Sequence, residues 1–249
     1  MKGELEGVAF QDRNGDNTFS ASADIAFADM RVLLSPMSDP DAAPSARAIT
    51  NAEGRFNVSG LVPGRYRMRV TSSTDVMLAV RDNIEVTAGQ ALTADVAIDP
   101  SGRVYDSVEG DLIDGAEVFI YRDEDTNADP LDATSLAQRV LVPPEDLLAA
   151  SQQGQRTAHG GLYRFDVKKP GRYLIEVIPP GASYVSPSVL VPVTPGVAFT
   201  ADPDGKVVPN DLPSVEPDAD RTWFLAFELA GPEDGIFNNH VPIDPLSAL

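Results

Sequence analysis

The feature that most constrains the fold is a repeated order of short alternating apolar and polar segments, seen when residues 7–70 are compared with residues 102–177. Both parts contain an alternating segment with an acidic turn, a second apolar segment, a Gly-containing hairpin, and a Pro-Gly turn leading into a Tyr-containing segment. The matched segments are 7–10 with 102–105, 30–34 with 116–121, 50–58 with 157–167, and 63–70 with 170–177. Four landmarks in one order indicate a duplicated domain.

Alternating segments bounded by Gly, Pro, Asn and Asp are typical of antiparallel strands in two stacked sheets. The composition fits, because Gly occurs 19 times and Pro 21 times in 249 residues. We therefore predict an all-β chain of two tandem Greek-key β-sandwich domains, prealbumin-like or Ig-like, at residues 1–99 and 100–249. We expect one short helix or turn at 143–150, and a strand at 222–229 that closes the second sandwich.

The formal net charge of −19 disfavours partners that carry many negative charges. Arg65, Arg67 and Arg69 alternate along a predicted strand and should line one solvated face. We therefore expect no nucleic acid partner. Cys is absent, which excludes disulfides and thiolate metal sites. Residues 1–20 lack the pattern of a signal peptide and no segment has ~18 consecutive apolar residues, so we expect an export signal outside this sequence and no membrane insertion within it.

Residue types suited to catalysis form no recognisable arrangement. The two histidines, His159 and His240, lie in a Gly-rich turn and beside a Pro, and we expect both on the surface. No Ser lies in a Gly-x-Ser-x-Gly motif. Trp223 could stack on a sugar, but its apolar neighbours favour the core, where Tyr66 and Tyr173 are also expected. We predict no catalytic residues and no enzymatic activity.

The residues after the first predicted strand have the spacing of a calcium loop. Asp12, Asn14 and Asp16 supply side-chain oxygens at alternate positions, Thr18 can offer its carbonyl, and Asp24 can close the ligand shell. A hard cation with many oxygen ligands suits Ca²⁺ better than Mg²⁺, which keeps its waters. We predict a Ca²⁺ site at these five residues. The alternative is a solvated acidic turn without metal.

A second acidic run alternates oxygen-bearing side chains at Asp123, Asp125, Asn127 and Asp129. It contains no Gly and has no matched closing acid. Two interpretations stay open for it, a second Ca²⁺ site and a plain solvated turn.

Residues 5–98 resemble the B-type repeats of serine-aspartate-repeat adhesins, within the wider group of collagen-adhesin B-type and prealbumin-like domains. The resemblance is carried by residues 7–16, Asp24, Val32, 54–56 and 61–66. The second half is similar to related domains at 102–106, 115–118, 163–165 and 179–184. The resemblance implies an extracellular protein, secreted or on a bacterial cell surface, in which calcium-stiffened domains hold a binding head away from the cell.

These features predict a non-catalytic, calcium-stabilised structural or adhesive module. A different class is a carbohydrate- or protein-binding module that uses the long loops at 122–156 and 200–220. A third is the subunit of a self-assembling surface filament or layer, in which exposed edges or the segment 236–240 pair between copies. The expected partners are accordingly a protein or glycan ligand, neighbouring domains, or copies of the same protein.

Overall fold

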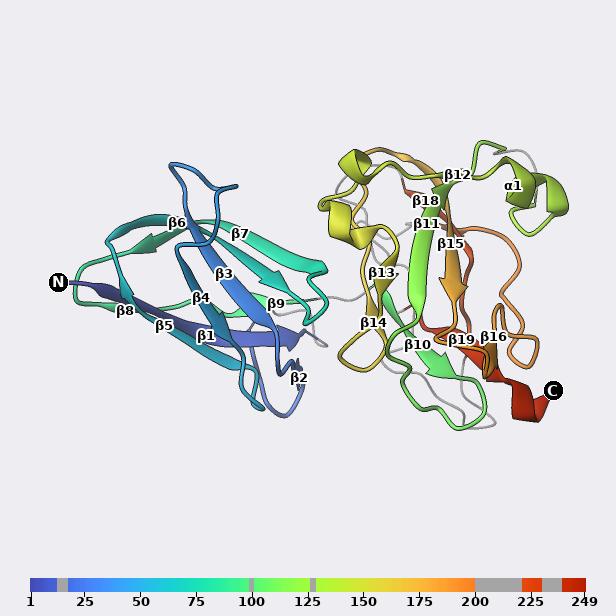
Figure 1. Ribbon diagram of the computed structural model, residues 1–249, viewed down its shortest axis with the longest axis horizontal. Helices are drawn as coiled ribbons and strands as arrows, with labels where there is room; N and C mark the ends of the chain where they lie inside the picture. The colour runs from blue at the N-terminus through green and yellow to red at the C-terminus, as the bar shows by residue number, and fades with distance from the viewer. Residues whose placement is uncertain (13–17, 99–100, 126–128, 200–220, 230–238) are drawn as a thin grey trace. The chain divides into compact units, whose positions relative to one another are not determined.

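The computed structural model describes residues 1–12, 18–98, 101–125, 129–199, 221–229 and 239–249. The chain divides into two compact units, Met1–Asp99 and Pro100–Leu249, which are described separately (Figure 1). Regular structure in both units is almost entirely β-strand. The prediction of an all-β chain of β-sandwiches is confirmed.

The first sheet of the first unit is built around β1 (Gly3–Gln11). β5 (Arg55–Leu61) and β2 (Ile25–Ala26) pair antiparallel with β1, at its beginning and end respectively. β8 (Ala91–Thr93) and β9 (Val96–Ala97) pair parallel with β1. The first strand of the unit is therefore hydrogen-bonded to the last.

The second sheet of the first unit has the order β4-β3-β6-β7, with every neighbouring pair antiparallel. Its strands are β3 (Arg31–Pro36), β4 (Ala46–Ile49), β6 (Gly64–Thr71) and β7 (Met77–Val86). The two sheets face each other through alternate side chains, which form the core.

The strand β6 shows how the alternation in the sequence produces this packing. Tyr66, Met68 and Val70 are buried, and the intervening arginines at 65, 67 and 69 lie on the outer face, as the sequence predicted. Burial of each large apolar side chain contributes about 1.5–3 kcal/mol. The turn before β5 needs Gly54, because its φ is +69° and a Cβ there would lie 2.7 Å from the carbonyl oxygen of Ala9.

One sheet of the second unit has the order β14-β10-β19-β16. Its strands are β10 (Gly102–Asp106), β14 (Leu162–Tyr163), β16 (Tyr184–Val185) and β19 (Val241–Pro245). β10 and β19 run parallel, so the first and last strands of this unit are also paired. The strand expected at 222–229 is present in part as β18 (Ala226–Leu229), but the prediction that it closes the sandwich is wrong, because β19 is the last strand.

The other sheet of the second unit is centred on β11 (Glu117–Arg122) and β15 (Gly171–Ile178). β12 (Val140–Leu141) and β13 (Gln155–Arg156) both pair with β11, and β18 (Ala226–Leu229) pairs with β15. β17 (Ala198–Phe199) pairs parallel with β18.

Among the described residues, helical structure is confined to short segments of the second unit. These are α1 (Ala133–Gln138) and the 3-10 turns η1 (Pro144–Asp146), η2 (Ala150–Gln152) and η3 (Leu246–Ala248). The short helix or turn expected at 143–150 is thus η1 and the first residue of η2, and α1 was not predicted. α1 begins after Asp132, whose carboxylate accepts a hydrogen bond from the N–H of Ser135. No helix in the described ranges is long and apolar enough to cross a membrane.

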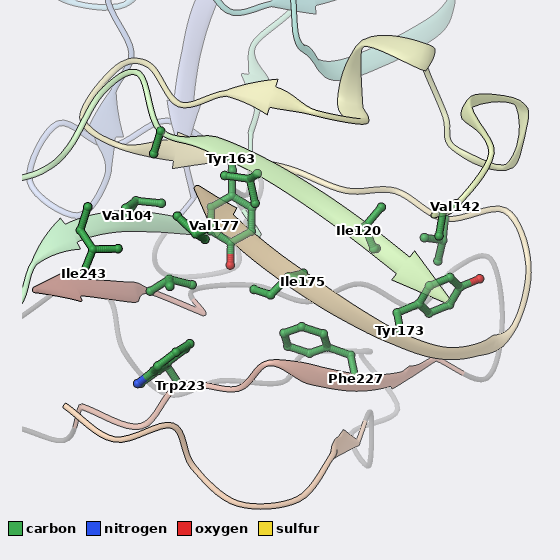
Figure 2. Close-up of a cluster of buried hydrophobic side chains, with 14 of the residues drawn as sticks. Val104, Ile120, Val142, Tyr163, Tyr173, Ile175, Val177, Trp223, Phe227 and Ile243 are labelled. Carbon is green, nitrogen blue, oxygen red and sulfur yellow. The ribbon is translucent and has the colours of Figure 1, made fainter. Parts of the chain in front are cut away.

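The core of the second unit lies between its two sheets (Figure 2). Trp223 is fully buried there, as predicted, and its indole N–H donates to the carbonyl of Val191 at 3.0 Å. Figure 2 shows the rings of Trp223 and Phe227 on one side of the cluster and the ring of Tyr163 on the other. This single Trp therefore reports on the folding of the second unit.

Each unit contains a buried Tyr that fastens the turn preceding its strand. The hydroxyl of Tyr66 donates to the carbonyl of Val62 at 2.7 Å, and that of Tyr173 donates to the carbonyl of Lys169 at 2.6 Å. Both bonds reach back four residues across a Pro-Gly turn, in the manner of a tyrosine corner. The prediction that both tyrosines belong to the core is confirmed.

Candidate functional site

The register of the strands places the two ends of the proposed calcium loop together. Gln11, the last residue of β1, pairs antiparallel with Ile25, the first residue of β2. The next residues outward, Asp12 and Asp24, therefore stand opposite each other where the loop leaves and re-enters the sheet. The ring of Phe19 packs edge-on against that of Phe10, with the ring centres 5.5 Å apart. This contact holds the C-terminal part of the loop against β1.

Asp24 is held by a turn that precedes β2. One of its carboxylate oxygens accepts the N–H of Ser20 at 2.7 Å, and the N–H of Asp24 donates back to the Ser20 carbonyl at 2.8 Å. Of the remaining predicted ligands, Thr18 is described and exposed, while Asn14 and Asp16 lie outside the described residues. Within the described ranges, no group of three or more His, Asp or Glu side chains could hold a metal ion. The Ca²⁺ site stays a prediction.

In the second acidic run, Asp123 forms an ion pair with Arg172. Its carboxylate contacts the Nε of Arg172 at 2.8 Å, with the two side chains 0% and 6% exposed respectively. The other carboxylate oxygen accepts the N–H of Asp125 at 3.1 Å, and Asp129 accepts the N–H of Leu131 at 3.0 Å. These contacts close the turn with its own side chains. The two interpretations, a second Ca²⁺ site and a plain solvated turn, stay open, although Asp123 itself is buried. Asn127 lies outside the described residues.

The loop that follows β10 in the second unit corresponds to the candidate calcium loop, but it lacks the alternating oxygen-bearing side chains of a metal site. Asp106, the last residue of β10, accepts the N–H groups of Val108 and Glu109 at 2.8 and 2.9 Å, and its carbonyl accepts the N–H of Gly110 at 2.9 Å. Its carboxylate therefore stabilises a local turn.

A buried, hydrogen-bonded carboxylate of the second unit, that of Asp244 in β19, was missed by the sequence analysis. It is 0% exposed and accepts hydrogen bonds from the hydroxyls of Ser107 and Ser188 and from the N–H groups of Val189 and Leu190. Burial alone would raise the pKa of Asp244, but the four hydrogen bonds outweigh it and lower the pKa. The cluster fastens two loops to the closing strand. Its residues are too far apart in the sequence to form a motif.

A second missed cluster surrounds the segment that enters β19. His240 is 5% exposed and its Nδ1 accepts the N–H of Arg103 at 3.2 Å, so the prediction of a surface His is wrong at this position. Asn239 is fully buried, and its carbonyl accepts the hydroxyl of Tyr163 at 2.7 Å. Burial raises the pKa of Tyr163. Asn239 and His240 are thus part of the core, and are not available for pairing between copies; residues 236–238 lie outside the described residues.

His159 differs from His240 in being partly exposed. Its backbone has a φ of +55°, and its carbonyl accepts a hydrogen bond from Arg103 at 3.0 Å. The guanidinium of Arg103 also donates to the carbonyl of Gly160 at 2.7 Å. Arg103 is 4% exposed, and burial lowers its pKa. This buried cation fixes the Gly-rich turn before β14.

Comparisons with known proteins give one family match and several distant structural similarities. Among solved structures, the minor pilin GBS52 of Streptococcus agalactiae is 18% identical over 39% of this chain and 44% of that chain, with a TM-score of 0.28. The major pilin subunit BcpA of Bacillus cereus is 12% identical over 39% of this chain and 30% of that chain, with a TM-score of 0.27. The shaft pilin spaA of Lactobacillus rhamnosus GG is 9% identical over 98% of both chains, with a TM-score of 0.28. The matched region covers less than half of GBS52 and of BcpA.

A search of curated proteins found no match. The family model that matches is the carboxypeptidase regulatory-like domain, an Ig-like and prealbumin-type domain, over residues 21–99. This is the broader prealbumin-like class that the sequence indicated. The finer resemblance to B-type repeats of serine-aspartate-repeat adhesins stays a hypothesis. Residues 21–99 of the first unit are thus similar to carboxypeptidase regulatory-like domains.

Proposed function

We propose that the chain is a non-catalytic structural or adhesive module of a bacterial cell-surface or secreted protein, and that Ca²⁺ stabilises its first unit. The observation that carries the structural role is the parallel pairing of the first and last strands of each unit, β1 with β9 and β10 with β19. Because the first and last strands run parallel, the chain enters the unit at one end of the sheet and leaves it at the opposite end. A pulling force along the chain then loads all the hydrogen bonds between those two strands in shear at the same time.

This role is tested by pulling the first unit in two directions with single-molecule force spectroscopy. The chain has no Cys, so attachment sites introduced by Lys2→Cys and Ala97→Cys are unique and load β1 against β9 in shear. The control pair, Lys2→Cys and Gln90→Cys, is attached at the same end of β1 and β8 and peels them apart one bond at a time. We expect a higher unfolding force in shear. Equal forces in the two directions would contradict a load-bearing role.

The proposal of Ca²⁺ rests on the opposition of Asp12 and Asp24 set by the register of β1 and β2. Two carboxylates at the mouth of one loop repel each other unless a cation or hydrogen bonds compensate. Together with Asn14, Asp16 and the Thr18 carbonyl they make the all-oxygen ligand set that Ca²⁺ prefers. Binding to the folded state alone would raise the stability of the first unit.

The two units can be followed separately in a thermal unfolding experiment with EDTA or with millimolar Ca²⁺. Trp223 fluorescence reports the second unit, because the chain has no other Trp, whereas circular dichroism reports both units. We expect Ca²⁺ to raise a transition seen by circular dichroism and to leave the Trp transition unchanged. Asp24→Asn and Asp16→Ala should abolish the shift, and Asp39→Asn, at an exposed acid outside the loop, should retain it. A chain freed of metal that shows no shift would leave the loop an ordinary acidic turn.

A second candidate function is binding of a glycan or protein through the loops of the second unit, and one groove there supports it. A cavity of about 300 Å³ beside α1 is lined by Leu136, Arg139, Leu174, Ile175, Glu176, Val177, Ser186, Pro187 and Leu225. The guanidinium of Arg139 lies 4.3 Å from the ring centre of Tyr121 and pairs with Glu176 at 2.9 Å, which combines polar groups with an apolar floor. A glycan and peptide array probed with the full chain and with Arg139→Ala separates this function from a pure spacer, which should bind nothing.

A further inference from the structure

The outer face of the second sheet of the first unit holds a groove over its edge strand, which we call the β3–β4 groove. Its volume is about 560 Å³, and it is lined by Arg31, Leu33, Pro44, Arg47, Ala48, Ile49 and Asp75. Among the described strands, β4 pairs with β3 alone, so it forms an edge of the sheet. None of its lining residues belongs to the candidate calcium loop, and the groove plays no part in the proposed spacer role.

The register of the two strands arranges charge and apolar surface alternately across this groove. Ile49 stands beside Arg31, and Arg47 stands beside Leu33. Ile49 is 64% exposed, a large apolar side chain left in solvent on an edge strand. Arg47 and Ile49 are two residues apart on one strand, so they point to the same side with a spacing of ~6.5–7 Å. The groove thus offers one cation and one apolar contact, and their spacing matches that of side chains two residues apart on an adjacent extended strand.

Most arginines on this face already have partners. Arg67 forms ion pairs with Asp82 at 2.6 Å and with Asp41 at 2.9 Å. Arg69 donates to the hydroxyl of Ser35 at 3.0 Å and to a carbonyl of the adjacent loop. These contacts tie the loop after β3 to the sheet.

In the groove itself the charges do not balance. Arg31 forms an ion pair with Asp75, whereas Arg47 is exposed and has no ion-pair or hydrogen-bond partner for its guanidinium within the described part of the chain. The charged lining residues are therefore two arginines and one aspartate, an excess of positive charge in a protein of net charge −19. A ligand with a carboxylate would complement this excess.

We propose that the β3–β4 groove binds an acidic peptide segment in extended conformation, which adds as a strand to the edge of β4. Backbone groups of the segment would pair with β4, a carboxylate would meet Arg47, and an apolar side chain two residues away would cover Ile49. The groove is lined by no aromatic side chain, which disfavours a sugar that binds by stacking. The recognised pattern is thus an Asp or Glu and a Val, Ile or Leu two residues apart, in an order that depends on the direction of the added strand.

The test uses the intact chain and a synthetic peptide, acetyl-Thr-Asp-Thr-Val-Thr-Asp-Thr-amide, followed by nuclear magnetic resonance of the labelled protein. Chemical shift changes should concentrate on β3 and β4. Loss of one charge-assisted hydrogen bond corresponds to about tenfold or more in affinity, so Arg47→Glu should weaken binding by at least that factor. Ile49→Thr should weaken it as well, and Arg55→Glu, an exposed Arg on the other sheet, should leave it unchanged. Salt should also weaken binding, because the pair is exposed.

Three outcomes would overturn the proposal. One is binding that survives Arg47→Glu unchanged, and another is equal binding of a peptide in which Lys replaces Asp. The third is the absence of peptide binding while sedimentation shows concentration-dependent self-association that Arg47→Glu abolishes, because the groove would then belong to a second copy of this chain. None of these results depends on Ca²⁺, so they are distinguishable from failure of the proposed calcium site.

Discussion

Replacing Asp244 with Ala would remove the acceptor of four hydrogen bonds inside the second unit. The hydroxyls of Ser107 and Ser188 can rotate toward other acceptors, but the N–H groups of Val189 and Leu190 are fixed by the backbone. Each buried donor left unsatisfied costs about 1–3 kcal/mol, and hydrogen bonds to a charged group contribute more than neutral ones. We therefore expect Asp244→Ala to lower the free energy of unfolding of the second unit by about 3–5 kcal/mol.

The measurement is urea unfolding followed by Trp223 fluorescence, which reports only the second unit. Asp244→Asn is the matched variant, because its amide oxygen can still accept the two backbone N–H groups while its NH₂ faces the serine hydroxyls. We expect it to cost about 1–3 kcal/mol, through the loss of charge. A loss below about 1 kcal/mol for Asp244→Ala would show that the hydrogen bonds are replaced by water and would refute the reasoning.

The lowered pKa of Asp244 gives the same prediction a pH dependence. The folded state holds the proton less tightly than the unfolded state, whose Asp pKa is 3.8, so the carboxylate stabilises the fold fully above that value. This contribution is lost as the pH falls through the lower pKa of the folded state. The stability difference between the native chain and Asp244→Asn should therefore shrink in acid, and a difference that grows in acid would contradict the assigned sign.

Three further substitutions probe the buried polar contacts of the units. Tyr66→Phe and Tyr173→Phe should each destabilise their own unit by about 0.5–1.5 kcal/mol in urea unfolding, because each removes one hydrogen bond and leaves the ring in place. Only Tyr173→Phe should shift the unfolding transition that Trp223 fluorescence reports. Asp123→Ala should destabilise the second unit by about 3–5 kcal/mol, because it removes the buried carboxylate that pairs with Arg172; an unchanged midpoint would argue that water reaches the guanidinium.

Strands with regular alternation could be predicted closely from the sequence. Residues 63–70 alternate between apolar and arginine, and β6 buries one set and exposes the other as expected. β19 was missed because it contains Pro242 and Pro245, and prolines argue against a strand within a sheet. Its parallel pairing with β10, in which Val241 lies beside Val104, 137 residues earlier in the chain, overrides that local signal.

The candidate calcium loop was predicted from local spacing, and the fold adds the opposition of Asp12 and Asp24 through the pairing of β1 with β2. The β3–β4 groove could not be predicted, because its shape depends on Asp75 and Pro44, which come from turns far from Arg31. The burial of His240 also has no signal in its neighbours along the chain. Its environment is made by Arg103, which only the sheet brings to it.

The sequence by itself determined the class of this protein: short alternating strands, a repeated order of landmarks, no Cys, and a strong negative charge. This works because the side-chain period of a strand is a local property of the backbone, so alternation in the sequence becomes two faces wherever the strand lies. Tertiary structure alone decided which polar groups are buried, as for Asp244 and Arg172. The physical reason is that a buried charge is tolerated only where distant segments supply its partners, and the sequence does not state which segments meet.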